Sequence, residues 1–211
     1  WQVDISGRVR TGKVMLYNPE NGRRIKEPHN YITWVHSLLK KENFNLRQCL
    51  FGEHLLSSDQ QRPVALVESE KSALISSFYL PQYLWIASGG KNGAFNRDAM
   101  SVLRNRRVLL FPDLGATDYW NSKMEMIRSL GIEVSLSDFM KKNATKEERD
   151  AGYDIADFLL REETKEAIFN RLITLNPALK TLVETFDLQL INVEKAPLSA
   201  TVQHTRKGLF K

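Results

Sequence analysis

Two acidic residues each stand at the end of a short apolar run. Glu68 follows residues 64–67, and Asp113 follows residues 107–112. Short apolar runs between turn residues are typical of buried parallel strands, and open α/β sheets bind ligands just beyond the carboxyl ends of their strands. We therefore expect Glu68 and Asp113 to reach one crevice, where their mutual repulsion favours a divalent cation or a shared proton between them.

A third acidic cluster follows further along the chain, at Asp154 and Asp157. Mg²⁺ takes oxygen ligands and is commonly held by one or two carboxylates together with a substrate phosphate. The pattern therefore predicts metal-dependent chemistry on a phosphate. A simpler interpretation stays open for each acid taken alone, because acids at strand ends are often only solvated or cap the next helix.

The composition limits the classes of protein to which the chain could belong. Its 211 residues, 42% of them hydrophobic, suffice for a real core. The net charge of +5, carried mostly by residues 1–62, is compatible with a nucleic-acid partner. The single cysteine, Cys49, excludes an internal disulfide and a multi-cysteine zinc site. No apolar stretch approaches the ~20 residues of a membrane span, and no signal peptide is visible, so we expect a cytoplasmic protein without a membrane partner.

The first part of the chain, residues 1–62, is predicted to be a small β-rich subdomain. Alternating apolar residues and turn residues predict a twisted hairpin or a three-stranded sheet that ends near residue 35. Residues 36–57 are predicted to be helical or irregular. The polar connector at residues 57–63 marks the expected domain boundary.

From residue 63 onward the pattern alternates between strand and helix. The expected strands are residues 64–67, 84–87, 107–111 and 132–136, and the expected helices are residues 70–79, 98–104 and 117–130. This alternation predicts an α/β domain over residues 63–162, a Rossmann-like parallel sheet flanked by helices. Residues 163–211 are predicted to form a helical segment, with a strand at 187–193 and a polar tail from Lys195.

These residues together resemble a TOPRIM domain, the metal-binding α/β module of bacterial primases, topoisomerases and related nucleases. The strand ending in Glu68, the glycines Gly89 and Gly90 after the next strand, the approach to Asp113 and the stretch around Asp154 follow the order of that family's motifs. The resemblance covers roughly residues 63–160. It implies a TOPRIM fold for this part of the chain.

One position departs from the family pattern. The family's third strand is followed by Asp-x-Asp, but the second of these positions is Gly115 here. Asp118 is the nearest replacement carboxylate, in the first turn of the following helix, where an acid is favoured by the helix dipole. The departure puts two-metal catalysis in doubt.

The resemblance implies a role for each matched residue. Glu68 would be the catalytic acid or base, and Asp113, Asp118 and Asp154 would hold Mg²⁺ or Mn²⁺. The expected phosphate- or nucleic-acid-binding residues are Lys71, Gly89, Gly90, Lys91 and Arg97. Backbone N–H groups of a glycine turn can cradle a phosphate, although such turns also arise for steric reasons. Lys71 in a first helical turn points to an anion nearby or to a salt bridge with Glu70 or another acid.

Basic residues gather in the front hairpin. They are Arg8, Arg10, Lys13, Arg23, Arg24 and Lys26, with Trp1, Tyr17 and Tyr31 among them as stacking surfaces. Such a distribution could follow a nucleic-acid backbone, although a run of charges is often only a solvated face.

Residues 12–17, Gly-Lys-Val-Met-Leu-Tyr, and residues 49–54, Cys-Leu-Phe-Gly-Glu-His, precede the α/β domain. On these residues, the segment before residue 63 resembles that of primase-like proteins of Bacteroides-type mobile elements. The resemblance implies a DNA primase-like nucleotidyltransferase, acting in mobile-element DNA replication on nucleotides and single-stranded DNA. Because the chain opens on Trp1, we expect a fragment that lacks a preceding zinc-ribbon domain, and the resemblance implies a helicase as partner. The alternatives are a catalytically degenerate TOPRIM module that only binds nucleic acid and a metal-dependent nuclease.

Overall fold

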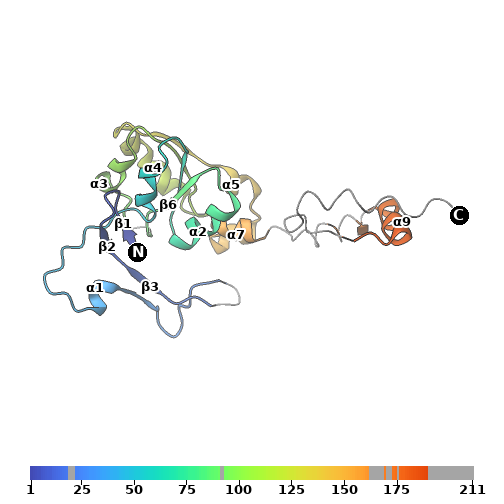
Figure 1. Ribbon diagram of the computed structural model, residues 1–211, viewed down its shortest axis with the longest axis horizontal. Helices are drawn as coiled ribbons and strands as arrows, with labels where there is room; N and C mark the ends of the chain where they lie inside the picture. Colours follow the sequence, from blue (N-terminus) through green and yellow to red (C-terminus); the bar gives the residue numbers. More distant parts are fainter. Residues whose placement is uncertain (19–21, 91–92, 162–168, 170–172, 175, 190–211) are drawn as a thin grey trace, which may run out of the picture. The chain divides into compact units, whose positions relative to one another are not determined.

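The computed structural model describes residues 1–18, 22–90, 93–161, 169, 173–174 and 176–189, and it divides the chain into two units, Trp1–Arg161 and Glu162–Lys211 (Figure 1). The second unit contains helix α9 (Pro177–Phe186). The tail predicted from Lys195 lies outside the described residues, as do residues 190–193 of the predicted strand, and residues 187–189 form no strand. None of the described helices has the length and apolarity that a bilayer span needs.

A four-stranded parallel sheet forms the centre of the first unit. Its strands are β5 (Val64–Val67), β6 (Leu84–Ala87), β7 (Arg107–Leu110) and β8 (Glu133–Leu136), in the order β6-β5-β7-β8. The chain first adds β6 on one side of β5 and then adds β7 on the other, so the connections diverge between β5 and β7. This point of divergence is where open α/β sheets bind their ligands.

Helices cover both faces of the sheet, and alternate residues of each strand supply the two cores. Val64 and Leu66 of β5 belong to one hydrophobic cluster with α4 (Thr117–Arg128), whereas Ala65 and Val67 belong to the other. The predicted α/β class is confirmed. The continuous apolar runs of the sequence reflect this burial on both faces.

The other helices that follow residue 63 in this unit are short. They are α2 (Glu70–Tyr79), α3 (Arg97–Met100) with the 3₁₀ turn η2 (Ser101–Leu103), α5 (Phe139–Asn143), α6 (Lys146–Ala151) and α7 (Ile155–Leu160). Helix α2 begins after Ser69, whose hydroxyl accepts a hydrogen bond from the Ser72 N–H. Ser69 stands where the TOPRIM pattern has glycine, and capping of α2 is its local role.

The N-terminal region forms two separate two-stranded antiparallel sheets. Strand β1 (Gln2–Val3) pairs with β2 (Val9–Thr11), and β3 (Lys13–Met15) pairs with β4 (Ile32–Trp34). The prediction of one hairpin or three-stranded sheet was therefore wrong. The change of partner occurs at Gly12, where an added Cβ would lie 2.8 Å from the Val35 side chain and 2.9 Å from the Trp1 ring. Only glycine fits this close approach.

Two contacts join the N-terminal region to the sheet. The bridge between Phe51 and Ala87 adds residues to the edge beside β6. The buried Glu53, in the 3₁₀ turn η1 (Glu53–Ser57), accepts hydrogen bonds from the N–H groups of Ile5 (3.0 Å) and Leu50 (3.1 Å). Helix α1 (Val35–Leu38) follows β4 directly. The Phe51–Ala87 bridge and the hydrogen bonds to Glu53 hold the N-terminal sheets and the parallel sheet in one compact unit.

Candidate functional site

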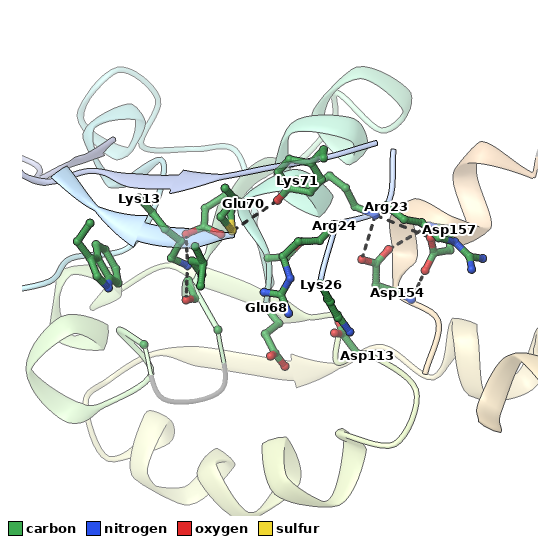
Figure 2. A pocket seen from close by; sticks show the side chains of 18 of the residues that line it. Lys13, Arg23, Arg24, Lys26, Glu68, Glu70, Lys71, Asp113, Asp154 and Asp157 are labelled. Atoms are coloured by element: carbon green, nitrogen blue, oxygen red, sulfur yellow. Dashed lines mark hydrogen bonds and ion pairs between the residues drawn. The ribbon is translucent and has the colours of Figure 1, made fainter. Parts of the chain in front are cut away.

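A cleft of about 900 Å³ opens at the carboxyl edge of the parallel sheet (Figure 2). Its acidic side chains are Glu68, Glu70, Asp113, Asp154 and Asp157, and its basic side chains from the N-terminal region are Lys13, Arg23, Arg24 and Lys26. Acidic groups from the sheet domain therefore share one cavity with cationic groups from the β-rich region. Such an arrangement can bind a phosphate-bearing ligand through the cations and a metal ion through the carboxylates.

Glu68 and Asp113 meet at the point where the sheet connections diverge. Glu68 follows β5 directly, and Asp113 lies just beyond the neighbouring parallel strand β7. Both side chains are partly buried and line the cleft. The structure thus brings together the two residues that the sequence singled out first.

Burial and like charges act strongly on Asp113. Burial of the carboxyl is the main cause of a pKa raised from 3.8 to about 8, and the negative charges of Glu68, Asp154 and Asp157 raise the pKa further against the opposing charge of Lys71. At neutral pH the Asp113 carboxyl therefore keeps its proton unless a cation offsets the neighbouring charges. A cation or a shared proton between these acids stays a prediction, and the raised pKa of Asp113 is consistent with it.

Asp154 and Asp157 form a reciprocal cap on α7. The Asp154 carboxylate accepts a hydrogen bond from the Asp157 N–H (3.0 Å), and the Asp157 carboxylate accepts one from the Asp154 N–H (3.1 Å). The Ser72 hydroxyl donates to the second oxygen of Asp154 at 2.6 Å. Asp154 is therefore held as a helix cap and as a link to α2, a role that the Asp154–Asp157 spacing signals in the sequence.

The cations near these acids take specific partners. Lys71 Nζ lies 4.0 Å from Asp154 Oδ2 and 3.9 Å from Asp157 Oδ1, so its first-turn position is explained by acids of α7. Lys13 Nζ, in contrast, lies 2.7 Å from Glu70 Oε1 and donates to the Gly89 carbonyl at 2.7 Å (Figure 2). Local sequence patterns contain no signal for the Lys13–Glu70 pair, since its members are 57 positions apart in the chain.

The glycine turn holds Glu68 rather than offering free N–H groups. The N–H groups of Gly89 and Gly90 both donate to the backbone carbonyl of Glu68, each at 3.0 Å. The predicted phosphate cradle is therefore corrected for these two residues, because their donors are already used inside the protein. Lys91 lies outside the described residues. The turn fixes the backbone that carries the Glu68 side chain into the cleft.

Two predicted site residues lie elsewhere. Asp118 is exposed in the first turn of α4 and does not line the cleft, because Gly115, with φ +91°, turns the chain before that helix begins. Arg97 donates to the Ser129 hydroxyl at 2.8 Å beyond the end of α4, and it does not line the cleft either. The predictions of Asp118 as a metal ligand and Arg97 as a phosphate contact thus have no support in this arrangement.

The basic residues of the N-terminal region divide into two groups. Arg8 and Arg10 pair with the buried Asp4 at 2.9 and 2.7 Å and lie outside the cleft. Lys13, Arg23, Arg24 and Lys26 line it, together with the rings of Tyr17 and Trp34. The second group therefore forms the cationic side of the site, and the first group stabilises the turn after β1.

The donor set fits a hydrated divalent ion better than a closed metal cage. No three His, Cys, Asp or Glu side chains among the residues that the structure describes converge closely enough to hold a metal. Glu68 and Asp113 remain as a pair of carboxylates without a hydrogen-bonded capping role. Mg²⁺ needs no more than one or two carboxylates when waters and substrate phosphate complete its coordination.

The fold and the cleft define the class as an α/β protein with a carboxylate-bearing cleft where its sheet connections diverge. Residues 1–114, more than half of the chain, match the model of a domain of unknown function, DUF6371, and the chain belongs to this family. No curated protein matches the chain. A crystal structure of the Aquifex aeolicus primase, containing its zinc-binding and RNA polymerase domains, is similar with a TM-score of 0.45 and 16% identity. The match covers 88% of this chain and 44% of the primase chain, so this chain spans less than half the length of the primase chain.

Proposed function

We propose that the cleft performs divalent-metal-dependent phosphoryl or nucleotidyl transfer on nucleic acid, as a primase-like TOPRIM domain. The observation that supports this proposal is the meeting of Glu68 and Asp113 from adjacent parallel strands, inside a cleft whose other wall is cationic. A phosphodiester backbone would bring the negative charge that Arg23, Arg24 and Lys26 attract. A role in mobile-element DNA replication, a preceding zinc-ribbon domain and a helicase partner rest on the sequence resemblance alone.

The proposal gives the two central carboxylates different tasks. When bound, Mg²⁺ or Mn²⁺ would offset the charge on the phosphoryl group and orient the attacking oxygen. Asp113, partly buried and surrounded by acids, would bind the ion, since its ionised form needs a nearby cation. Glu68 would share in binding or accept a proton from the attacking hydroxyl.

A second candidate is a nucleic-acid-binding module without catalysis. The observation that favours it is Gly115, whose φ of +91° is a conformation that a second aspartate would adopt only with strain. In addition, Asp154 and Asp157 are committed to capping α7. The site then keeps its cations for binding while its carboxylates no longer suffice for chemistry.

Metal titration followed by an activity assay separates the two candidates. Mn²⁺ binding is measured by calorimetry on the wild type, Asp113→Asn and Glu68→Gln, with the exposed Asp118→Asn as the matched control. Primer synthesis and cleavage of labelled single-stranded DNA are then measured in Mn²⁺. The enzymatic proposal expects both activity and metal binding to fall at least about tenfold in the two cleft variants only. DNA binding without Mn²⁺ binding would refute it and support the binding module.

A further inference from the structure

A second cavity, of about 350 Å³, lies between the N-terminal strands and α2. Its apolar lining comes from three parts of the chain: Trp1, Met15, Tyr17, Phe51, Leu74 and Ile75. The volume lies within the range of small-molecule sites. Three of these side chains are aromatic, and aromatic rings favour a flat apolar ligand that can stack against them.

The amide of Gln2 is the polar group of this cavity that lacks a partner. The Gln2 side chain lines the cavity and is only 3% exposed, and both its Nε2 and its Oε1 are buried without a hydrogen-bond partner in the described structure. Burial of an amide without partners is unfavourable. A ligand that carries a donor beside an acceptor would satisfy both atoms at once.

The cavity shares a wall with the acidic and basic cleft. The residues that line both spaces are Lys13, Met15, Tyr17, Glu70 and Lys71. Lys13 Nζ and Gln2 Nε2 also approach the same glycine, since a Cβ added to Gly89 would lie 3.8 and 3.4 Å from them. A ligand whose flat end fills the cavity therefore has two ammonium groups nearby for an anionic end, which would compete with the present partners of these lysines: Glu70 for Lys13, and Asp154 and Asp157 for Lys71.

We propose that this cavity binds an adenine nucleotide, with the base against Gln2 and the phosphate toward Lys13 and Lys71. A nucleotide supplies all three required features: a flat heteroaromatic ring, an adjacent donor and acceptor, and an anion. Glutamine pairs with adenine through the N6 amino group and N7, whereas the corresponding edge of guanine offers two acceptors. Because a protein side chain reads the base, this binding needs no template and no metal, and it goes beyond the proposed function of the cleft.

Calorimetry in EDTA tests the site independently of any metal chemistry. The probes are AMP, GMP, adenosine and ribose 5-phosphate. We expect AMP to bind the wild type at least about tenfold more tightly than GMP and ribose 5-phosphate, a difference that one paired hydrogen-bonding edge can supply. Equal affinities for AMP and ribose 5-phosphate would overturn the proposal, as would absence of AMP binding at millimolar concentration.

Two variants examine the cavity from different sides. Gln2→Leu removes the amide at nearly constant size, and Leu74→Trp fills the cavity from α2, where Leu74 is 61% exposed and a substitution is tolerated. Each should reduce AMP affinity to that of ribose 5-phosphate, while Gln2→Leu raises the melting temperature because an unpaired amide is lost. Gln61→Leu, outside both cavities, is the matched control. Unchanged AMP affinity in Leu74→Trp refutes the site even if Gln2→Leu fails to fold.

Discussion

Replacement of Asp113 by asparagine removes an acid whose ionised form is unfavourable in the folded protein. The Asp113 carboxyl is partly buried beside Glu68, Asp154 and Asp157, and its pKa rises from 3.8 to about 8. A group with a raised pKa in the folded state stabilises the fold fully only below its unfolded pKa. Its contribution is then lost as the pH rises through the folded pKa. Wild-type stability should therefore fall between about pH 4 and pH 8.

The size of this effect follows from the pKa difference. At about 1.4 kcal/mol per pKa unit, the interval from 3.8 to pH 7 sets an upper limit of about 4 kcal/mol. Because the Asp113 side chain is partly exposed and solvent screens its neighbours, we expect about half of this, or about 2 kcal/mol. For a chain of this length Asp113→Asn should then raise the melting temperature at pH 7 by about 4–8 °C.

Thermal unfolding at several pH values, with and without Mn²⁺, measures this effect. Without metal, Asp113→Asn should be more stable than the wild type at pH 7–8 and equally stable near pH 4. With Mn²⁺ the difference in melting temperature between the variant and the wild type should become smaller or change sign, because a ligand stabilises only the protein that binds it. Asp118→Asn, an exposed first-turn acid, should show no gain. An Asp113→Asn variant that is less stable than the wild type at pH 8 without metal would refute the reasoning.

Three further predictions concern the N-terminal region and the glycine turn. Glu53→Ala leaves two backbone N–H groups without an acceptor and should lower the free energy of unfolding by about 2–4 kcal/mol in urea; a loss within error would contradict it. Gly93→Ala places a Cβ 2.2 Å from the Ser88 carbonyl oxygen, so thermal unfolding should show a loss of more than about 2 kcal/mol. Exchanging Arg24 and Lys26 together for glutamine should weaken single-stranded DNA binding and reduce its salt slope by about 1.4; an unchanged slope would exclude these residues as phosphate contacts.

Regular local patterns explain why much of the sheet domain was predictable. The apolar runs at β5 and β6 are continuous because both faces are buried, and the structure confirms their predicted bounds. Helix α2 was predicted at its observed bounds, since Ser69 caps its start and Pro81 follows its end. The N-terminal sheets were less predictable, because the change of strand partner falls at Gly12, where residues distant in the chain pack closely.

The types and order of the residues along the chain determined the α/β class and the presence of acids beyond two neighbouring strands. These features depend on local periodicity and on the general rule that parallel strands present their carboxyl ends at one edge. Only the tertiary structure decided that Lys13 pairs with Glu70, that Asp154 caps α7, that Asp118 and Arg97 lie outside the cleft, and that Gln2 is buried without a partner. The physical reason is that burial, partners and pKa depend on neighbours distant in the chain, which only packing brings together.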